Sequence, residues 1–168
     1  LICHLLGGEV THVSGMVSTD IWKLDRSEDN AFVHLRTKSG ALGSLHSSWS
    51  EWKGYHFYVE AYGDCGMARA YYAPMQATVI TMDKPGGKQR IKRHYYPGAI
   101  LKEKIFGWQS TVVQTFVEEL EDFVRFVAGD ESGVIATASD GLRSIAIPND
   151  VYDSSDQNRI IPLESYLN

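Results

Sequence analysis

The strongest constraint in this sequence is a helical repeat of apolar residues in its last third. Apolar side chains recur there at intervals of three and four residues, with mainly polar and acidic residues between them: Val113, Phe116, Val117, Leu120, Phe123, Val124 and Val127. That spacing places them on one face of a helix. Glycine is common just beyond a helix C-terminus, and Gly129 follows the repeat. The sequence therefore predicts an amphipathic helix over about residues 111–128.

Residues 10–96 follow a different pattern, in which short runs rich in β-branched and aromatic residues alternate with turn residues. Such runs are typical of β-strands, and glycine-containing breaks between them are typical of hairpins. The expected strands are residues 10–19, 31–38, 41–50, 55–62, 67–72, 77–82 and 88–96. Residues 97–108 show no clear period, so we expect a loop there.

Ser39 and Gly40 have the composition of a two-residue hairpin turn between the second and third strands. In that register Val33 shares a face with Leu42, while His34 and His46 point to opposite faces. Because both faces then carry apolar residues, we expect helices on one side of the sheet and a partner surface on the other.

A second long helix is expected near the C-terminus. Thr137 and Asp140 have the spacing of a capping box, which marks a helix start. From there the sequence predicts Leu142 and Ile145 on the inward face. Pro148 is expected to kink or restart this helix, because proline lacks the backbone donor that an interior position needs.

The order of expected elements indicates a fold class. Residues 1–6 read as the end of a helix that stops at Gly7, and residues 159–163 read as a short closing strand. With about seven strands and two helices between them, the chain is expected to form an α+β domain. Its sheet is expected to be open and largely antiparallel, with helices packed on one face. A length of 168 residues fits a single domain.

The composition argues against several classes of protein. Hydrophobic residues make up 43% and charged residues 22% of the chain, as in ordinary globular domains. No apolar run reaches the ~20 residues of a membrane-spanning helix. The net charge of -5 argues against a nucleic-acid partner, which would demand clustered positive charge. Two cysteines are too few for a disulfide framework, so we expect a cytoplasmic protein.

Motifs that carry chemistry are sparse. The chain has no Gly-x-Gly-x-x-Gly loop, and the Gly86, Gly87, Lys88 run lacks the other residues of a phosphate-binding loop, so no cofactor site is expected. The six histidines lack the close spacing of a zinc site, so no metal site is expected either. No Gly-x-Ser-x-Gly element is present, and Cys65 has no evident base beside it.

An aromatic cluster follows the third expected strand. It consists of Trp49, Trp52, Tyr55, Phe57 and Tyr58, with Lys53 and His56 among them. Rings of this kind stack on a sugar while their polar tips bind its hydroxyl groups. Tryptophan and tyrosine are also enriched at subunit interfaces, so a packing role is the second interpretation. The two interpretations are compatible, and the sequence leaves both open.

Short motifs follow one another along nearly the whole chain in an order found in a known family. They are residues 5–8 (LLGG), 29–31 (DNA), 39–45 (SGALGSL), 48–49 (SW), 60–63 (EAYG), 116–123 (FVEELEDF) and 140–142 (DGL). In this order the chain resembles the C-terminal domain of the glucose-fructose oxidoreductase and inositol dehydrogenase (Gfo/Idh/MocA) family. The resemblance implies a dihydrodipicolinate reductase-like domain over residues 1–168, with an N-terminal dinucleotide-binding domain outside this chain.

The resemblance also implies an activity. Family members oxidise or reduce a carbinol of a sugar, cyclitol or related molecule with NAD or NADP. Their open sheet forms the subunit interface, which implies a homodimer or homotetramer here. The chain opens at Leu1 without a methionine, and the family's catalytic histidine is expected upstream of it. We therefore expect no catalytic residue and no bound cofactor in this chain, which alone is expected to be inactive.

The resemblance assigns a substrate role to part of the aromatic cluster. Cyclitol-type members place a tyrosine at the start of the strand that matches Tyr55, so Tyr55 is expected to contact a substrate hydroxyl. Trp52 and Lys53 are its expected companions, and Trp49 either joins them or fills the core.

The leading hypothesis is thus the substrate-facing and oligomerising half of an NAD(P)-dependent oxidoreductase that acts on a small polyhydroxylated molecule. The alternative is a non-enzymatic β-sheet module for self-association or partner binding. A sheet that stacks nucleic-acid bases on its aromatic residues is disfavoured by the net charge of -5.

Overall fold

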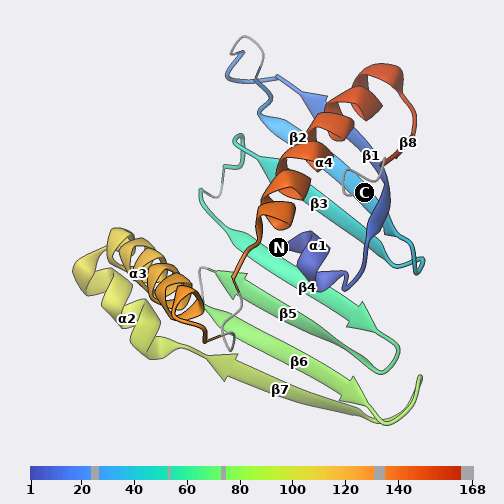
Figure 1. Ribbon diagram of the computed structural model, residues 1–168. Helices are drawn as coiled ribbons and strands as arrows, with labels where there is room; N and C mark the ends of the chain where they lie inside the picture. Colours follow the sequence, from blue (N-terminus) through green and yellow to red (C-terminus); the bar gives the residue numbers. More distant parts are fainter. Residues whose placement is uncertain (24–26, 53, 73–74, 131–134, 164–168) are drawn as a thin grey trace. The chain divides into compact units, whose positions relative to one another are not determined.

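The computed structural model describes residues 1–23, 27–52, 54–72, 75–130 and 135–163. The chain divides into two compact units (Figure 1). Unit 1 combines Leu1–Trp52 with Ala136–Asn168, and unit 2 is the segment Lys53–Ile135 between them. Each unit contains one four-stranded sheet, and all strand pairs within the two sheets are antiparallel. The α+β class with antiparallel strands is confirmed, but the strands form two sheets and not one.

Unit 1 is built from both ends of the chain. Its sheet has the order β3-β2-β1-β8, and two helices accompany it. The elements are α1 (Ile2–Leu5), β1 (Val10–Ser18), β2 (Asn30–Thr37), β3 (Leu42–Ser48), α4 (Ala138–Gln157) and β8 (Ile161–Pro162). α4 packs on β1 and lies across this sheet in Figure 1.

The core of unit 1 lies between its sheet and α4. Alternate residues of the strands point towards the helix, and the buried apolar side chains are Val13, Val33, Leu35, Val151 and Ile161. Within this core, α4 and β1 approach each other closely at Gly15. A Cβ atom placed on Gly15 would come within 2.6 Å of Val151 Cγ1. Glycine is therefore required on β1 for α4 to pack this closely.

The start of α4 follows the sequence prediction, but its packing face does not. Thr137 is the N-cap, and its side chain and that of Asp140 form a reciprocal capping box. Leu142 and Ile145, predicted to face inward, are 43% and 65% exposed. The buried residues of α4 lie in its second half, where the helix meets β1, so the inward prediction was wrong. The helix also continues through Pro148 without a restart.

The turn between β2 and β3 corrects the predicted register. The Thr37 N–H donates to Ala41 O at 2.9 Å, so residues 38–40 form a three-residue loop between this bonded pair, with Gly40 at a φ of 91°. A glycine at positive φ suits the last position of such a turn. Because the connection is one residue longer than predicted, every side chain of the partner strand changes face. Val33 pairs with Leu45, and Leu42 pairs with Arg36, so Val33 and Leu42 lie on opposite faces and not on one face as predicted.

Unit 2 is one continuous segment with the sheet order β4-β5-β6-β7. Its elements are β4 (Phe57–Gly63), β5 (Gly66–Tyr72), β6 (Gln76–Met82), β7 (Gln89–Tyr95), α2 (Pro97–Phe106) and α3 (Trp108–Val127). The four strands agree with the sequence prediction to within two residues, but β4 begins at Phe57, so Tyr55 lies just before the strand and not at its start. α2 does not, because a loop was predicted there. Pro97 at the first helical turn starts this helix, where its missing N–H has no cost.

α3 confirms the predicted amphipathic helix and extends it at the N-terminal end. Its apolar stripe is largely exposed, as shown by exposed fractions of 60% for Phe116 and 63% for Leu120. None of the residues described in unit 2 is fully buried. Across the described part of the chain, none of the helices is both long enough and apolar enough to cross a membrane.

Candidate functional site

The predicted site residues are divided between the two units. Trp49 and Trp52 belong to unit 1, and Tyr55 belongs to unit 2. Lys53 lies outside the described residues. All three described aromatic side chains are strongly exposed, at 80% for Trp49, 97% for Trp52 and 80% for Tyr55. Trp49 therefore does not fill the core of unit 1, which was the second role considered for it.

The backbone of Trp49 is held by a network around Asp29. The Trp49 N–H donates to Asp29 O at 2.8 Å, and the Trp22 indole Nε1–H donates to Trp49 O at 3.2 Å. The Asp29 carboxylate in turn accepts the backbone N–H groups of Ile21, Asp20 and Trp22, which lower the pKa of this buried carboxyl below its usual value. The network fixes the chain at Trp49 and leaves the indole ring exposed.

Tyr55 lies against a second tyrosine within unit 2. The rings of Tyr55 and Tyr72 meet edge to face, with centroids 5.5 Å apart and an interplanar angle of 77°. The Tyr72 hydroxyl donates to Glu103 Oε1 at 2.9 Å, which joins β5 to α2. Burial raises the pKa of Tyr72, and the Glu103 carboxylate raises it further. Tyr72 is therefore a protonated donor at neutral pH.

Tyr72 and Glu103 were not among the residues that the sequence singled out. Tyr72 was assigned to a strand, and nothing in its neighbourhood marks it as different from Tyr71. Glu103 lies in the segment that was predicted to be a loop. The pairing of the two residues depends on the contact between α2 and the end of β5, which the sequence pattern does not encode.

The face of the unit 1 sheet that points away from α4 carries polar and apolar groups together. His34 and His46 share this face, contrary to the prediction, because His46 pairs with Phe32 two residues away from His34. The rings of Phe32 and His46 are stacked with centroids 4.1 Å apart. A shallow hollow of about 160 Å³ on this sheet is lined by His12, Val13, Ser14, His34, Leu35, Arg36, Leu42 and Ile160.

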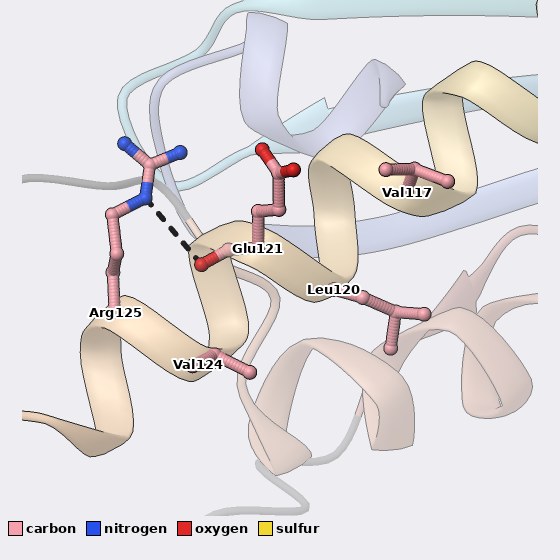
Figure 2. Close-up of a pocket in the computed structure, with 5 residues that line it drawn as sticks. All are labelled: Val117, Leu120, Glu121, Val124 and Arg125. Atoms are coloured by element: carbon pink, nitrogen blue, oxygen red, sulfur yellow. Dashed lines mark hydrogen bonds between the residues drawn. The ribbon is translucent and has the colours of Figure 1, made fainter.

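A further hollow on unit 2 is formed by α3 alone. Figure 2 shows the five side chains that border it, namely Val117, Leu120, Glu121, Val124 and Arg125. Arg125 Nε donates to Glu121 O at 3.4 Å, and its guanidinium also bonds Asp122 at 2.7 Å. Since all five residues come from one helix, the hollow is an open helix surface. It brings no reactive groups together.

A family model and a curated relative both match this chain. Residues 1–69 match the family model described as the GFO/IDH/MocA C-terminal domain. The chain is 27% identical over 168 residues to myo-inositol 2-dehydrogenase from Thermotoga maritima. The alignment covers 98% of this chain and 46% of that protein. The resemblance to the Gfo/Idh/MocA C-terminal domain is confirmed. The chain spans about half the length of the curated relative that it matches.

Solved structures of similar fold include dehydrogenases that bind sugars. Levoglucosan dehydrogenase in complex with NADH and levoglucosan has a TM-score of 0.71 at 17% identity, over 94% of this chain and 46% of that chain. The WlbA dehydrogenase from Bordetella pertussis in complex with NADH and UDP-GlcNAcA has a TM-score of 0.62 at 20% identity, over 94% of this chain and 43% of that chain. At such identities the likeness shows a shared fold and nothing further.

The described residues of this domain do not fit a dinucleotide. A dinucleotide site of the usual kind uses a parallel strand, a glycine-rich turn and a free helix N-terminus. All strand pairs in the two sheets are antiparallel, so the described residues contain no parallel strand that leads into such a turn. Nor do the described residues contain a group of three or more side chains suited to a metal ion.

Proposed function

We propose that this chain is the C-terminal, substrate-facing part of an NAD(P)-dependent oxidoreductase that acts on a carbinol of a sugar, cyclitol or related polyol. The observation that carries the proposal is the alignment with myo-inositol 2-dehydrogenase over 98% of this chain. The likeness to dehydrogenases solved with NADH and sugar-type ligands supports it. The dinucleotide and the catalytic histidine belong to the part of the protein outside this chain.

Tyr55 is the residue that we assign to the substrate in this part. It lies within the 1–69 segment that matches the family model, and the residue is 80% exposed. A phenol offers a hydrogen bond to a polyol hydroxyl and an apolar ring face to its carbon skeleton. For Trp49, Trp52 and Lys53 a contact with the substrate stays a prediction from the sequence.

The test uses the full-length protein that contains this chain. We expect it to bind NADH and to reduce NAD⁺ or NADP⁺ with a polyol from a panel that includes myo-inositol and levoglucosan. Residues 1–168 alone should bind no NADH and show no activity. Tight NADH binding by this chain alone, or a full-length protein without NADH binding, would overturn the proposal.

The role of Tyr55 is tested by removing its hydroxyl. Tyr55→Phe should raise KM for the active polyol roughly tenfold, as expected for one lost hydrogen bond of about 1.4 kcal/mol. The matched control is Tyr95→Phe, because Tyr95 on β7 is also exposed, at 64%. Equal KM values in the wild type and Tyr55→Phe would remove Tyr55 from the substrate pocket.

We also propose that the outer face of the unit 1 sheet forms the interface of a homodimer or homotetramer. Its exposed apolar side chains support this role, with exposed fractions of 65% for Met16, 48% for Phe32 and 69% for Leu42. Phe32→Asp should lower the mass measured by light scattering to that of a smaller assembly. A non-enzymatic self-association module would give the same result but no polyol oxidation by the full-length protein. Two free thiols, Cys3 and Cys65, suit the cytoplasm that we propose as its location.

A further inference from the structure

We propose that Tyr72 and Glu103 are substrate-positioning residues, which hold the ring of Tyr55 in the orientation that receives the polyol. The inference rests on the proposed function of Tyr55 and extends it to two residues that have no assigned role. It makes α2 a part of the substrate site, although the sequence pattern suggested only a loop there.

Tyr55 contacts one neighbouring ring among the described residues, that of Tyr72. Its side chain is 80% exposed, and a side chain this exposed keeps most of its rotational freedom unless a neighbour restrains it. Among the described residues, the one ring contact recorded for Tyr55 is the edge-to-face contact with Tyr72, at 5.5 Å and 77°. Edge-to-face pairs are an attractive arrangement with a defined geometry. The orientation of Tyr55 therefore depends on where the Tyr72 ring lies.

Tyr72 is itself held in place by a hydrogen bond to α2. Its ring is partly buried, and its hydroxyl donates to Glu103 Oε1 at 2.9 Å. A hydrogen bond to a carboxylate is shorter and stronger than one between neutral groups. Glu103 is also partly buried and lies on α2, so this helix fixes the position of the carboxylate that holds Tyr72. Two contacts therefore link α2 to Tyr55: the hydrogen bond between Glu103 and Tyr72, and the ring contact between Tyr72 and Tyr55.

A positioning role predicts a specific kinetic pattern. When a loose side chain must be immobilised as the substrate binds, the cost appears in substrate affinity. Tyr72→Phe keeps the ring but loses the hydrogen bond, and Glu103→Ala removes the acceptor. Each should raise KM for the active polyol roughly threefold to tenfold with kcat little changed, as expected for a loss of ordering before binding. Glu103→Gln keeps an acceptor oxygen and should restore most of the loss.

The experiment measures these variants in the full-length protein with the polyol that it oxidises, myo-inositol being the first probe. The control is Glu119→Ala, which removes an exposed carboxylate from α3 and should leave KM unchanged. In a Tyr55→Ala background, Glu103→Ala should have no further effect on KM. A merely structural role would instead lower the melting temperature and change KM whether or not Tyr55 is present.

A second measurement does not need turnover. With 3-fluorotyrosine incorporated, the Tyr55 signal is identified as the one lost in Tyr55→Phe. We expect this signal to narrow and shift in both Tyr72→Phe and Glu103→Ala, because the ring becomes more mobile. An unchanged signal in both variants would overturn the inference.

The outcomes separate the two proposals. If Tyr55→Phe leaves KM unchanged, the proposed role of Tyr55 at the substrate fails. If Tyr55→Phe raises KM while Tyr72→Phe and Glu103→Ala do not, the role of Tyr55 stands and the positioning inference fails.

Discussion

The two units of this chain use the same kind of sheet but differ in how they bury it. Each has four antiparallel strands, yet every buried residue of the described chain lies in unit 1. In unit 1, α4 lies close to β1 because Gly15 leaves room for Val151. In unit 2 the longest helix, α3, keeps its apolar stripe largely exposed. A correct strand pattern is therefore not sufficient for a core, which also needs a helix that fits closely against the strands.

The largest test of this difference compares one leucine from each unit. Leu35 is 2% exposed in the core of unit 1, whereas Leu120 on α3 is 63% exposed. Leu35→Ala should lower the free energy of unfolding by about 2–5 kcal/mol, since it removes buried methyl groups and leaves a cavity. Leu120→Ala should change it by less than about 0.5 kcal/mol. The measurement is chemical denaturation, and equal losses would mean that α3 is buried in solution.

A smaller effect is expected from the polar contact that joins α4 to the sheet. The buried Ser154 hydroxyl accepts the Gly15 N–H at 3.0 Å and donates to Arg159 O at 2.6 Å. Ser154→Ala leaves that N–H unsatisfied and should cost about 1–3 kcal/mol of unfolding free energy. The control is Ser144→Ala, because the exposed Ser144 hydroxyl donates to Gly141 O within its own helix. If both variants lower the free energy of unfolding equally, the hydrogen bond between Gly15 and Ser154 does not stabilise the core.

The smallest effect concerns the first turn of α4. Thr137 and Asp140 cap this helix reciprocally, whereas α3 has no side-chain cap. Thr137→Ala should lower the free energy of unfolding by about 1 kcal/mol. Thr115→Ala inside α3 should lower it by less, because alanine is a better helix former than threonine. Chemical denaturation of both variants measures the difference.

The same cap predicts a dependence on pH. Hydrogen bonds from the Thr137 side chain and backbone lower the pKa of Asp140 below its usual value. A carboxyl with a lowered pKa in the folded state stabilises the fold above its unfolded pKa, and that stability is lost as the pH falls through the folded pKa. The cost of Thr137→Ala should therefore shrink at acidic pH. A constant cost from neutral pH down to the unfolding limit would contradict this assignment.

Much of the local structure was predictable, because it depends on patterns within a few residues. The apolar repeat gave α3, the alternation of strand and turn residues gave β4 to β7, and Thr137 with Asp140 gave the start of α4. The register of β2 and β3 was not predictable to one residue, because Ser39 and Gly40 fit a two-residue turn as well as the longer one that forms. The prediction of the inward face of α4 was wrong, because that face depends on where β1 meets the helix.

The candidate site divides in the same way. Tyr55 was identified from its place in a family pattern, and its exposure suits a contact residue. Tyr72 and Glu103 were missed because they are 31 residues apart in sequence and meet only through the packing of α2 near β5. Contacts of this kind have no local signature, so only the folded arrangement reveals them.

The division of unit 1 between the two ends of the chain has a consequence for folding. Its Gly15 N–H meets a hydroxyl 139 residues further along, so the sheet and α4 are joined only after unit 2 has been synthesised. Contacts between distant residues are slow to form, because a long loop must first be closed. During synthesis on the ribosome, the first three strands of unit 1 emerge before α4 and β8, with which they form their core. Unit 2 is one continuous segment, so all of its strands emerge one after another. The better-packed unit is thus the later one to assemble.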